Sequence, residues 1–272
     1  MSKLDEVGRS VRSRTVSAVK AAFRHLGVDM DLGREVGLRT IRRGDTFIVS
    51  YPKSGNTWVR FLLASILLVD RAATFHDLDD FVPDVHKYGA RIDMTWRRRL
   101  IKSHYAYCSR YPKFVYICRD GRDVMVSYYH FQVQRGQFGG SFSEFIRSRQ
   151  TKIFGLWKWH EHVSEALREK DRRPDDVLFL RYEDMLADPF AVAPDLAAFC
   201  GIEASADRVA NAVRNCSFEK LRDIETTYGG SGDVERFMRK GTSNQWPDYF
   251  SQEDLDYFQN QAWETMARVG YR

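Results

Sequence analysis

The sequence has few cysteines and no long hydrophobic run. Its 4 cysteines are scattered over 272 residues, and no two of them form a C-x-x-C pair. This spacing does not indicate a disulfide framework or a zinc site, so we expect buried, reduced thiols. The longest apolar run, FLLASILLV, has nine residues, about half of a membrane-spanning helix. Because the N-terminal residues also lack the apolar core of a signal peptide, we expect a cytoplasmic protein.

Neither sign of charge dominates the chain. It has 42 Lys and Arg residues against 37 Asp and Glu, a net charge of +5. This small excess suits an anionic ligand, and a solvated basic surface explains it equally well. The basic residues do not form one long stripe, so we predict no nucleic acid partner. We also predict no metal, because His160 and His162 are spaced to face different ways on a helix and no other ligand spacing occurs.

From residue 45 onward, apolar strands alternate with helices. Continuous apolar character predicts strands at TFIVS (46–50), RLIKSH (99–104), KFVYICR (113–119) and VLFLRYE (177–183). Helices are expected at 57–69, 123–134 and 152–170, with mostly helices after the last strand. Buried strands that alternate with helices are typical of a parallel sheet with right-handed crossovers. The predicted fold is therefore a single α/β domain, a central parallel sheet flanked by helices.

Residues 1–44 differ from this domain, which we place at 45–272. They are basic, and apolar residues from Val7 to Leu26 recur at helical spacing. We predict a basic helical N-terminal extension. It packs on the domain, contacts a membrane surface or a partner protein, or stays disordered; the sequence leaves these alternatives open.

A polar, glycine-containing loop follows the first strand. The usual phosphate-binding order G-x-x-x-x-G-K-[ST] is absent, and no Gly-Lys dipeptide occurs in the chain. Instead, YPKSGNTW (51–58) places Lys53, Ser54, Gly55 and Thr57 before an apolar helix. The amino end of a helix carries a partial positive charge and free N–H groups, which bind phosphate. The alternative is that Ser and Thr only cap the helix.

A second strand-to-helix turn, CRDGRDVMVSYYHF (118–131), carries Arg119 at the end of a strand. Ser127 lies about two helical turns further on and shares a helix face with Asp123. Arg119 and Ser127 are predicted to hold a second phosphate at the carboxyl edge of the sheet, where α/β proteins bind ligands. The alternative is a salt bridge at a helix start.

Two further stretches carry candidate residues. In IKSHYAY (101–107), Lys102 and His104 point to the same face of an extended chain. A His beside a Lys stays neutral near pH 7, as a general base must. In FMRKGTSNQW (237–246), Arg239, Lys240 and Gly241 offer two cations and a permissive backbone, or form a solvated loop.

Together these stretches resemble one family, the sulfotransferases that use 3′-phosphoadenosine 5′-phosphosulfate (PAPS). The motif Y-P-K-[SA]-G-[TN]-T-W is met by residues 51–58, and R-[DN]-x-x-D-x-x-x-S-Y-Y by 119–129. K-[TS]-H is met by 102–104 and R-K-G by 239–241. The similarity spans about residues 45–265 in the right order. It implies a nucleotide-binding core like that of P-loop kinases.

The resemblance implies transfer of a sulfonate group from PAPS to a hydroxyl or amine of a small-molecule, lipid or sugar acceptor. The acceptor attacks in line, with His104 as general base and with Lys53 and Lys102 stabilising charge. Adenosine 3′,5′-bisphosphate (PAP) is the product, and no metal is required. The implied 5′-phosphate site is Lys53, Ser54, Gly55, Asn56 and Thr57; the 3′-phosphate site is Arg119, Ser127, Arg239, Lys240 and Gly241; the adenine frame is Trp58, Tyr182 and Phe218. The three aromatic residues would otherwise be ordinary packing residues.

The sequence departs from the animal cytosolic branch of that family at two points. Cys216 stands where that branch has Thr near the adenine, which puts that contact in doubt. The C-terminal dimerisation segment is not matched by PDYFSQEDLD, so the oligomeric state is left open. The acceptor pocket is expected in 70–98 and 132–150, the stretches least similar to family motifs, and 132–150 is a candidate lid. A P-loop kinase and an inactive binding module for PAPS or nucleic acid are the competing interpretations.

Overall fold

A computed structural model describes residues 28–29, 37–68, 71, 73–92, 99–228 and 241–272 of the chain. The residues that carried the predicted N-terminal helix, 7–26, lie outside this part. Within the predicted N-terminal extension, residues 1–44, β1 (Val28–Asp29) and β2 (Ile41–Arg42) pair as short antiparallel strands. No helix among the described residues combines the length and apolarity needed to cross a membrane.

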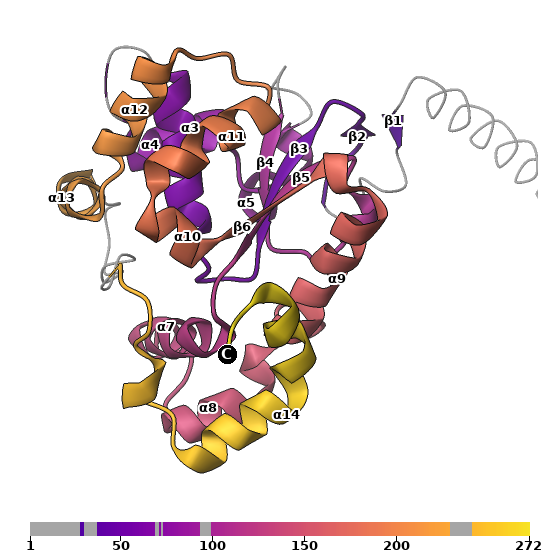
Figure 1. Cartoon of the computed structure of the whole chain (residues 1–272), viewed down its shortest axis with the longest axis vertical. Coiled ribbons are helices and arrows are strands. Elements are labelled where there is room, and N and C mark those ends of the chain that lie inside the picture. The colour runs from indigo at the N-terminus through magenta and orange to yellow at the C-terminus, as the bar shows by residue number, and fades with distance from the viewer. Residues whose placement is uncertain (1–27, 30–36, 69–70, 72, 93–98, 229–240) are drawn as a thin grey trace, which may run out of the picture.

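The centre of the molecule is a parallel sheet of four strands in the order β4-β3-β5-β6 (Figure 1). The strands are β3 (Thr46–Ser50), β4 (Leu100–Ser103), β5 (Lys113–Cys118) and β6 (Val177–Arg181). They confirm the four predicted strands, with ends that differ by at most two residues. The order places β3 between β4 and β5, so the loops that follow these three strands open side by side.

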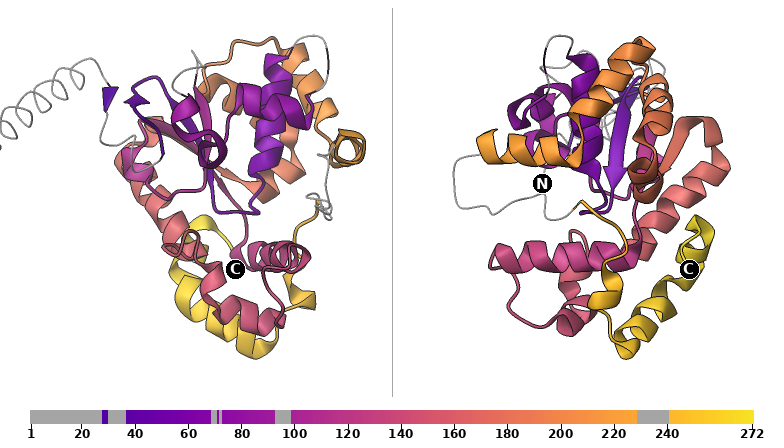
Figure 2. Two further views of the ribbon diagram at one scale, coloured as in Figure 1. Left: turned by 180° about the vertical axis from the view of Figure 1, so that it is seen from behind. Right: turned by 60° about the vertical axis from the view of Figure 1, so that its left-hand side comes forward.

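Helices cover both faces of the sheet (Figures 1 and 2). Between the strands lie α3 (Asn56–Leu67), α4 (Phe75–Phe81), α5 (Val85–Tyr88), α7 (Gly121–Gln134), α8 (Phe142–Arg147) and α9 (Trp159–Arg172). After β6 come α10 (Tyr182–Ala187), α11 (Pro189–Phe199), α12 (Ala206–Asn215), α13 (Phe218–Tyr228) and α14 (Gln252–Val269). Short 3-10 turns occur at 89–91, 108–110, 149–151, 174–176 and 246–248.

Alternate side chains of each strand enter different halves of the core, as the twofold period of a strand requires. In β5, Phe114 and Tyr116 join the cluster built with α7, α9 and α14, whereas Val115 and Ile117 join the cluster built with α3, α11 and α12. Both faces of the strand are therefore buried, which explains its unbroken apolar sequence. All four cysteines are buried, as predicted, and they are thiols that form no disulfide bond.

The predicted helix over 152–170 is wrong in its first part, because α9 begins only at Trp159. The preceding residues form a tight turn closed by pairing of Ile153 with Trp157. Phe154 (φ 53°) and Gly155 (φ 73°) adopt left-handed backbone conformations, which a right-handed helix cannot contain. This turn points an aromatic side chain away from the core, and Phe154 is 51% exposed.

Candidate active site

A cavity of about 620 Å³ opens at the carboxyl edge of the sheet. It collects predicted site residues from all four stretches and from the predicted adenine frame. Those that line it are Lys53, Gly55, Asn56, Thr57, Trp58, Lys102, His104, Arg119, Ser127, Tyr182, Phe218 and Gly241. Ser54 is fully buried within its loop. Arg239 and Lys240 lie outside the described residues.

The loop after β3 is shaped by its backbone. Lys53 (φ 69°) and Gly55 (φ 101°) both adopt left-handed conformations, and α3 begins at the next residue. A Cβ at Gly55 would come within 2.7 Å of the Tyr182 ring, so only glycine fits. No side chain caps α3 and its first turn contains no acidic residue. The amino end of α3 is thus suited to an anion.

The side-chain amide of Asn56 donates to the Ile48 carbonyl (3.1 Å) and to Ser50 Oγ (3.2 Å), so it fixes the loop to β3.

Other polar atoms of this site are buried without a partner among the described residues. Ser54 Oγ and Arg119 Nε have no hydrogen-bond partner. Buried donors are normally satisfied, and a bound anion would satisfy these two. The residues present therefore fit a phosphate-bearing ligand.

Arg119 joins three parts of the cavity. Its guanidinium donates to the Lys53 carbonyl (3.3 Å) and to the Thr242 carbonyl (2.9 Å). It also lies 4.6 Å from the centroid of the Tyr182 ring, within the range of a cation–π contact. An ion pair of Arg119 with Asp123, at the start of α7, is present but long, at 3.8 Å.

Asp123 anchors a segment that lies far from it in the sequence. Its buried carboxylate accepts the backbone N–H groups of Asn244 (2.6 Å), Gln245 (2.8 Å) and Trp246 (3.0 Å). These bonds fix the segment that begins at Gly241 onto the amino end of α7. A carboxylate that accepts several N–H groups is a strong anchor, and the spacing of the motif gave no indication of it.

Aromatic rings form one wall of the cavity. The rings of Trp58 and Tyr182 meet edge to face, with centroids 5.8 Å apart. Gly241 has φ 65°, and a Cβ there would lie 2.1 Å from the Phe218 ring. Phe218 thus packs directly on the backbone at Gly241. The predicted adenine frame and the predicted 3′-phosphate loop are therefore in contact with each other.

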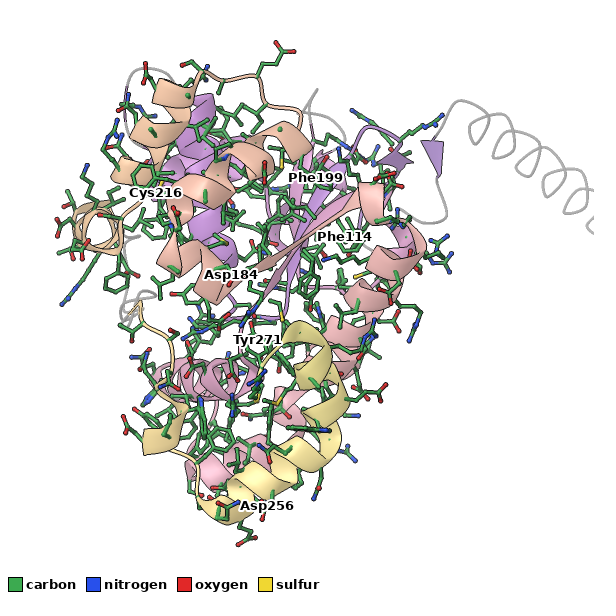
Figure 3. The ribbon with its side chains drawn as sticks, in the orientation of Figure 1. Phe114, Asp184, Phe199, Cys216, Asp256 and Tyr271 are labelled. Atoms are coloured by element: carbon green, nitrogen blue, oxygen red, sulfur yellow. The ribbon has the colours of Figure 1, made fainter. Side chains whose placement is uncertain are left out.

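Cys216 lines the cavity beside Phe218, at the C-terminal end of α12 (Figure 3). Its thiol donates to Ser65 Oγ at 3.4 Å. Burial raises its pKa to about 11, so the thiol is neutral at pH 7. Because the thiol donates its hydrogen bond to Ser65 of α3, we expect Cys216 to make only van der Waals contact with a bound nucleotide.

His104 is held in one tautomer by its neighbours. Its Nδ1 lies 2.7 Å from the Ser50 carbonyl, which can only accept, so Nδ1 carries the proton. The lone pair is therefore on Nε2. Burial lowers the pKa of His104 well below its usual value, and the nearby Lys102 and His86 lower it further. The ring is neutral at pH 7 with a free basic nitrogen.

His86 is a cavity residue that sequence reasoning missed. Its Nε2 accepts the backbone N–H of His104 at 2.8 Å, and the two imidazoles stack with centroids 5.8 Å apart. Burial, with a smaller effect of Lys102, lowers the pKa of His86 to about 4. No motif marked this residue, because its partner is 18 positions away in the chain.

Lys102 forms an ion pair with Asp84, with 2.7 Å between Nζ and Oδ2. Burial lowers the pKa of Lys102, and the Asp84 carboxylate opposes that shift. Asp84 belongs to the acid-rich stretch 77–84. Asp77 and Asp79 of the same stretch form ion pairs with arginines and do not line the cavity. Asp84 pairs with Lys102 and does line the cavity.

Of the two stretches predicted to build the acceptor pocket, only the first contributes residues to the cavity lining. From 70–98, Asp84 and His86 line the cavity, whereas no lining residue comes from 132–150. Phe138, Phe142 and Phe145 of that second stretch pack with Tyr129 in the core instead. Phe131, Ile153 and Phe154, on either side of it, supply the apolar lining.

Comparison with protein families matches residues 43–270 to a family described as "Sulfotransferase domain". Among curated relatives, flavonol 3-sulfotransferase of Flaveria bidentis is 29% identical, with 88% of this chain and 87% of that protein covered. Human sulfotransferase 4A1 is 30% identical, with 67% of this chain and 68% of that protein covered.

Solved structures show the same fold. Mouse sulfotransferase SULT7A1 complexed with PAP has a TM-score of 0.61 and 22% identity, covering 83% of this chain and 84% of that one. Retinol dehydratase in complex with androsterone and inactive cofactor PAP has a TM-score of 0.63 and 24% identity, covering 85% and 83%.

Proposed function

The chain belongs to the sulfotransferase domain family and is a PAPS-dependent sulfotransferase, and we propose that it sulfonates a hydroxyl or amine of a small molecule with His104 as general base. The observation that carries this proposal is that His104, with its lone pair on Nε2, lines the same cavity as the loop after β3. The aromatic lining favours a ring-bearing acceptor. The flavonol in the name of one relative and the androsterone bound to one solved neighbour support a small acceptor.

We propose that the loop after β3 holds the 5′-phosphate of PAPS through Lys53, Ser54, Thr57 and the backbone at Gly55 and Asn56. The free amino end of α3 and the unpartnered Ser54 hydroxyl support this assignment. The Asn56 side-chain amide fixes the loop to β3. The proposed 3′-phosphate residues are Arg119, Ser127 and Gly241, with Arg239 and Lys240; the adenine frame is Trp58, Tyr182 and Phe218.

PAPS supplies the sulfonate group to be transferred. Nε2 of His104 takes the acceptor proton while the acceptor oxygen or nitrogen bonds to sulfur and the sulfur–oxygen bond to PAP breaks. Lys53 and Lys102 stabilise the charge that develops on the leaving and sulfonate oxygens. The cavity holds the two reactants together, which removes much of the entropic cost of their encounter.

Calorimetric titration of the protein with PAP, AMP and ATP tests the donor assignment. We expect PAP to bind at least about tenfold more tightly than AMP, because a charge-assisted contact to the 3′-phosphate contributes roughly 1.5–3 kcal/mol. Equal affinities for PAP and AMP would show that no 3′-phosphate site exists. Preference for ATP with Mg²⁺ would favour the kinase interpretation.

The rate of transfer is expected to stay constant from about pH 8 down to below the usual His value of about 6.5. A general base acts when deprotonated, and burial together with Lys102 and His86 holds the pKa of His104 low. Activity should therefore fall only at more acidic pH. In Lys102→Met one depressing charge is lost, so the acidic limb of the kcat/KM profile should move to higher pH. An acidic limb at about 6.5 in the wild type would contradict this account of His104.

A further inference from the structure

We infer that Asp84 and His86 form a polar subsite that selects acceptors whose aromatic ring carries a second hydroxyl group. The inference rests on the proposed function, since it places the acceptor in the cavity with one hydroxyl at His104. It names a narrower substrate class, dihydroxylated aromatic rings, than the small-molecule acceptor of the proposed function.

Asp84 offers a hydrogen-bond acceptor inside the cavity. Its Oδ1 accepts the His86 backbone N–H (2.9 Å) and its Oδ2 accepts from Lys102 Nζ (2.7 Å). A carboxylate has about four acceptor positions, so these two bonds leave capacity on each oxygen. The side chain is 20% exposed and lines the cavity. A hydroxyl group of a bound ligand can donate to it.

His86 offers a donor in the same place. Because its Nε2 accepts the His104 backbone N–H, the ring proton of the neutral imidazole is on Nδ1. No protein atom of the described residues accepts from that N–H. A hydrogen bond from the His86 backbone N–H to the Asp84 carboxylate joins the two residues, and the His86 ring stacks on His104, the proposed base. Together they present one acceptor and one donor, which is what a hydroxyl group requires.

Aromatic rings complete the subsite. Phe154 stacks on His86, with centroids 4.8 Å apart and an interplanar angle of 29°. Tyr105 lies 4.5 Å from His86 and 4.6 Å from Phe154. Phe154 is half exposed and held in a left-handed conformation that a bulky residue rarely adopts. It offers a flat apolar surface to a ring in the cavity.

The charges at this end favour a neutral ligand. The Asp84 carboxylate is paired with Lys102, and Arg60, which also lines the cavity, is paired with Asp79. A cationic amine would meet no net negative charge. A neutral hydroxyl, in contrast, gains a hydrogen bond to a charged partner, which is worth about 10- to 100-fold in binding.

The test measures kcat/KM with labelled PAPS for three probes: 4-methylphenol, 4-methylcatechol and 5-methylresorcinol. In the wild type, at least one dihydroxy probe should exceed 4-methylphenol by about tenfold or more. In Asp84→Leu the preference should disappear. The overall rate should also fall for all probes, because Lys102 loses its partner, so the ratio between probes is the readout.

Two further variants separate a specific role from a structural one. Asp84→Asn keeps an oxygen for the His86 N–H and should reduce the preference without abolishing it. Asp79→Asn removes the same charge from a side chain of similar exposure, 19%, outside the cavity lining, and should leave the ratio unchanged.

The outcomes also distinguish the two levels of proposal. Equal use of the three probes by the wild type, or an unchanged ratio in Asp84→Leu, would overturn the subsite. PAP binding with no transfer to any probe would overturn it too, while the donor site stands. Loss of discrimination between PAP and AMP in the wild type would instead remove the proposed function.

Discussion

Replacement of His104 with Asn is expected to lower kcat for sulfonate transfer by about 10²–10⁴-fold, the usual contribution of a general base. His104→Asn tests the role of the base more specifically than His104→Ala does. The Asn amide can keep the donor to the Ser50 carbonyl that Nδ1 now provides, whereas the basic Nε2 is lost. PAP affinity should stay within about threefold of the wild type, because the 5′-phosphate loop keeps its own contacts. Steady-state kinetics and calorimetric titration measure the two quantities separately.

His76→Ala is the matched control for that substitution. His76 is exposed on α4 and does not line the cavity, so its loss should leave both kcat and PAP affinity unchanged. His104→Ala should reduce kcat at least as much as His104→Asn does. If His104→Asn kept the wild-type turnover, the base would be another group. If PAP binding fell together with kcat, His104 would have a structural role in holding β3 and β4.

The sequence predicted which residues meet at the end of the cavity that we propose binds PAPS, because local features carry that information. Lys53, Gly55 and Arg119 each follow a buried apolar strand, and the carboxyl ends of neighbouring parallel strands must meet at one edge. The strand order places β3 between β4 and β5, which brings these loops together with His104. A prediction of this kind needs only the position of each strand and the rule for parallel sheets.

The end of the cavity that we propose binds the acceptor could not be predicted in the same way, because it depends on contacts that no periodicity encodes. His86 meets His104 through one backbone N–H, and Asp84 meets Lys102 across 18 residues. The turn that presents Phe154 was predicted as helix, because its apolar residues happen to follow helical spacing. Phe154 in this left-handed turn packs on His86 and Tyr105, and these are contacts between residues far apart in the chain.

Replacement of Arg119 with Ala is expected to weaken PAP binding by about 100-fold or more while AMP binding changes far less. A guanidinium contributes paired charge-assisted bonds to a phosphate, and the unpartnered buried Nε of Arg119 is available for one of them. Arg119→Lys keeps the charge but not the planar fork, so it should fall between the wild type and Arg119→Ala. Calorimetric titration of the wild type and of both variants with PAP and AMP gives the six affinities needed.

The comparison of PAP with AMP is essential because Arg119 also holds the protein together. Its bonds to the Lys53 and Thr242 carbonyls join two loops, so its removal can loosen the whole site. If the role of Arg119 is purely structural, its replacement should weaken the binding of PAP and of AMP by the same factor. If Arg119 contacts the 3′-phosphate, its replacement should weaken the binding of PAP alone. Arg135→Ala removes the same charge from an exposed position directly after α7, and it should change neither affinity. An equal loss for PAP and AMP in Arg119→Ala would move the 3′-phosphate site away from the β5–α7 turn.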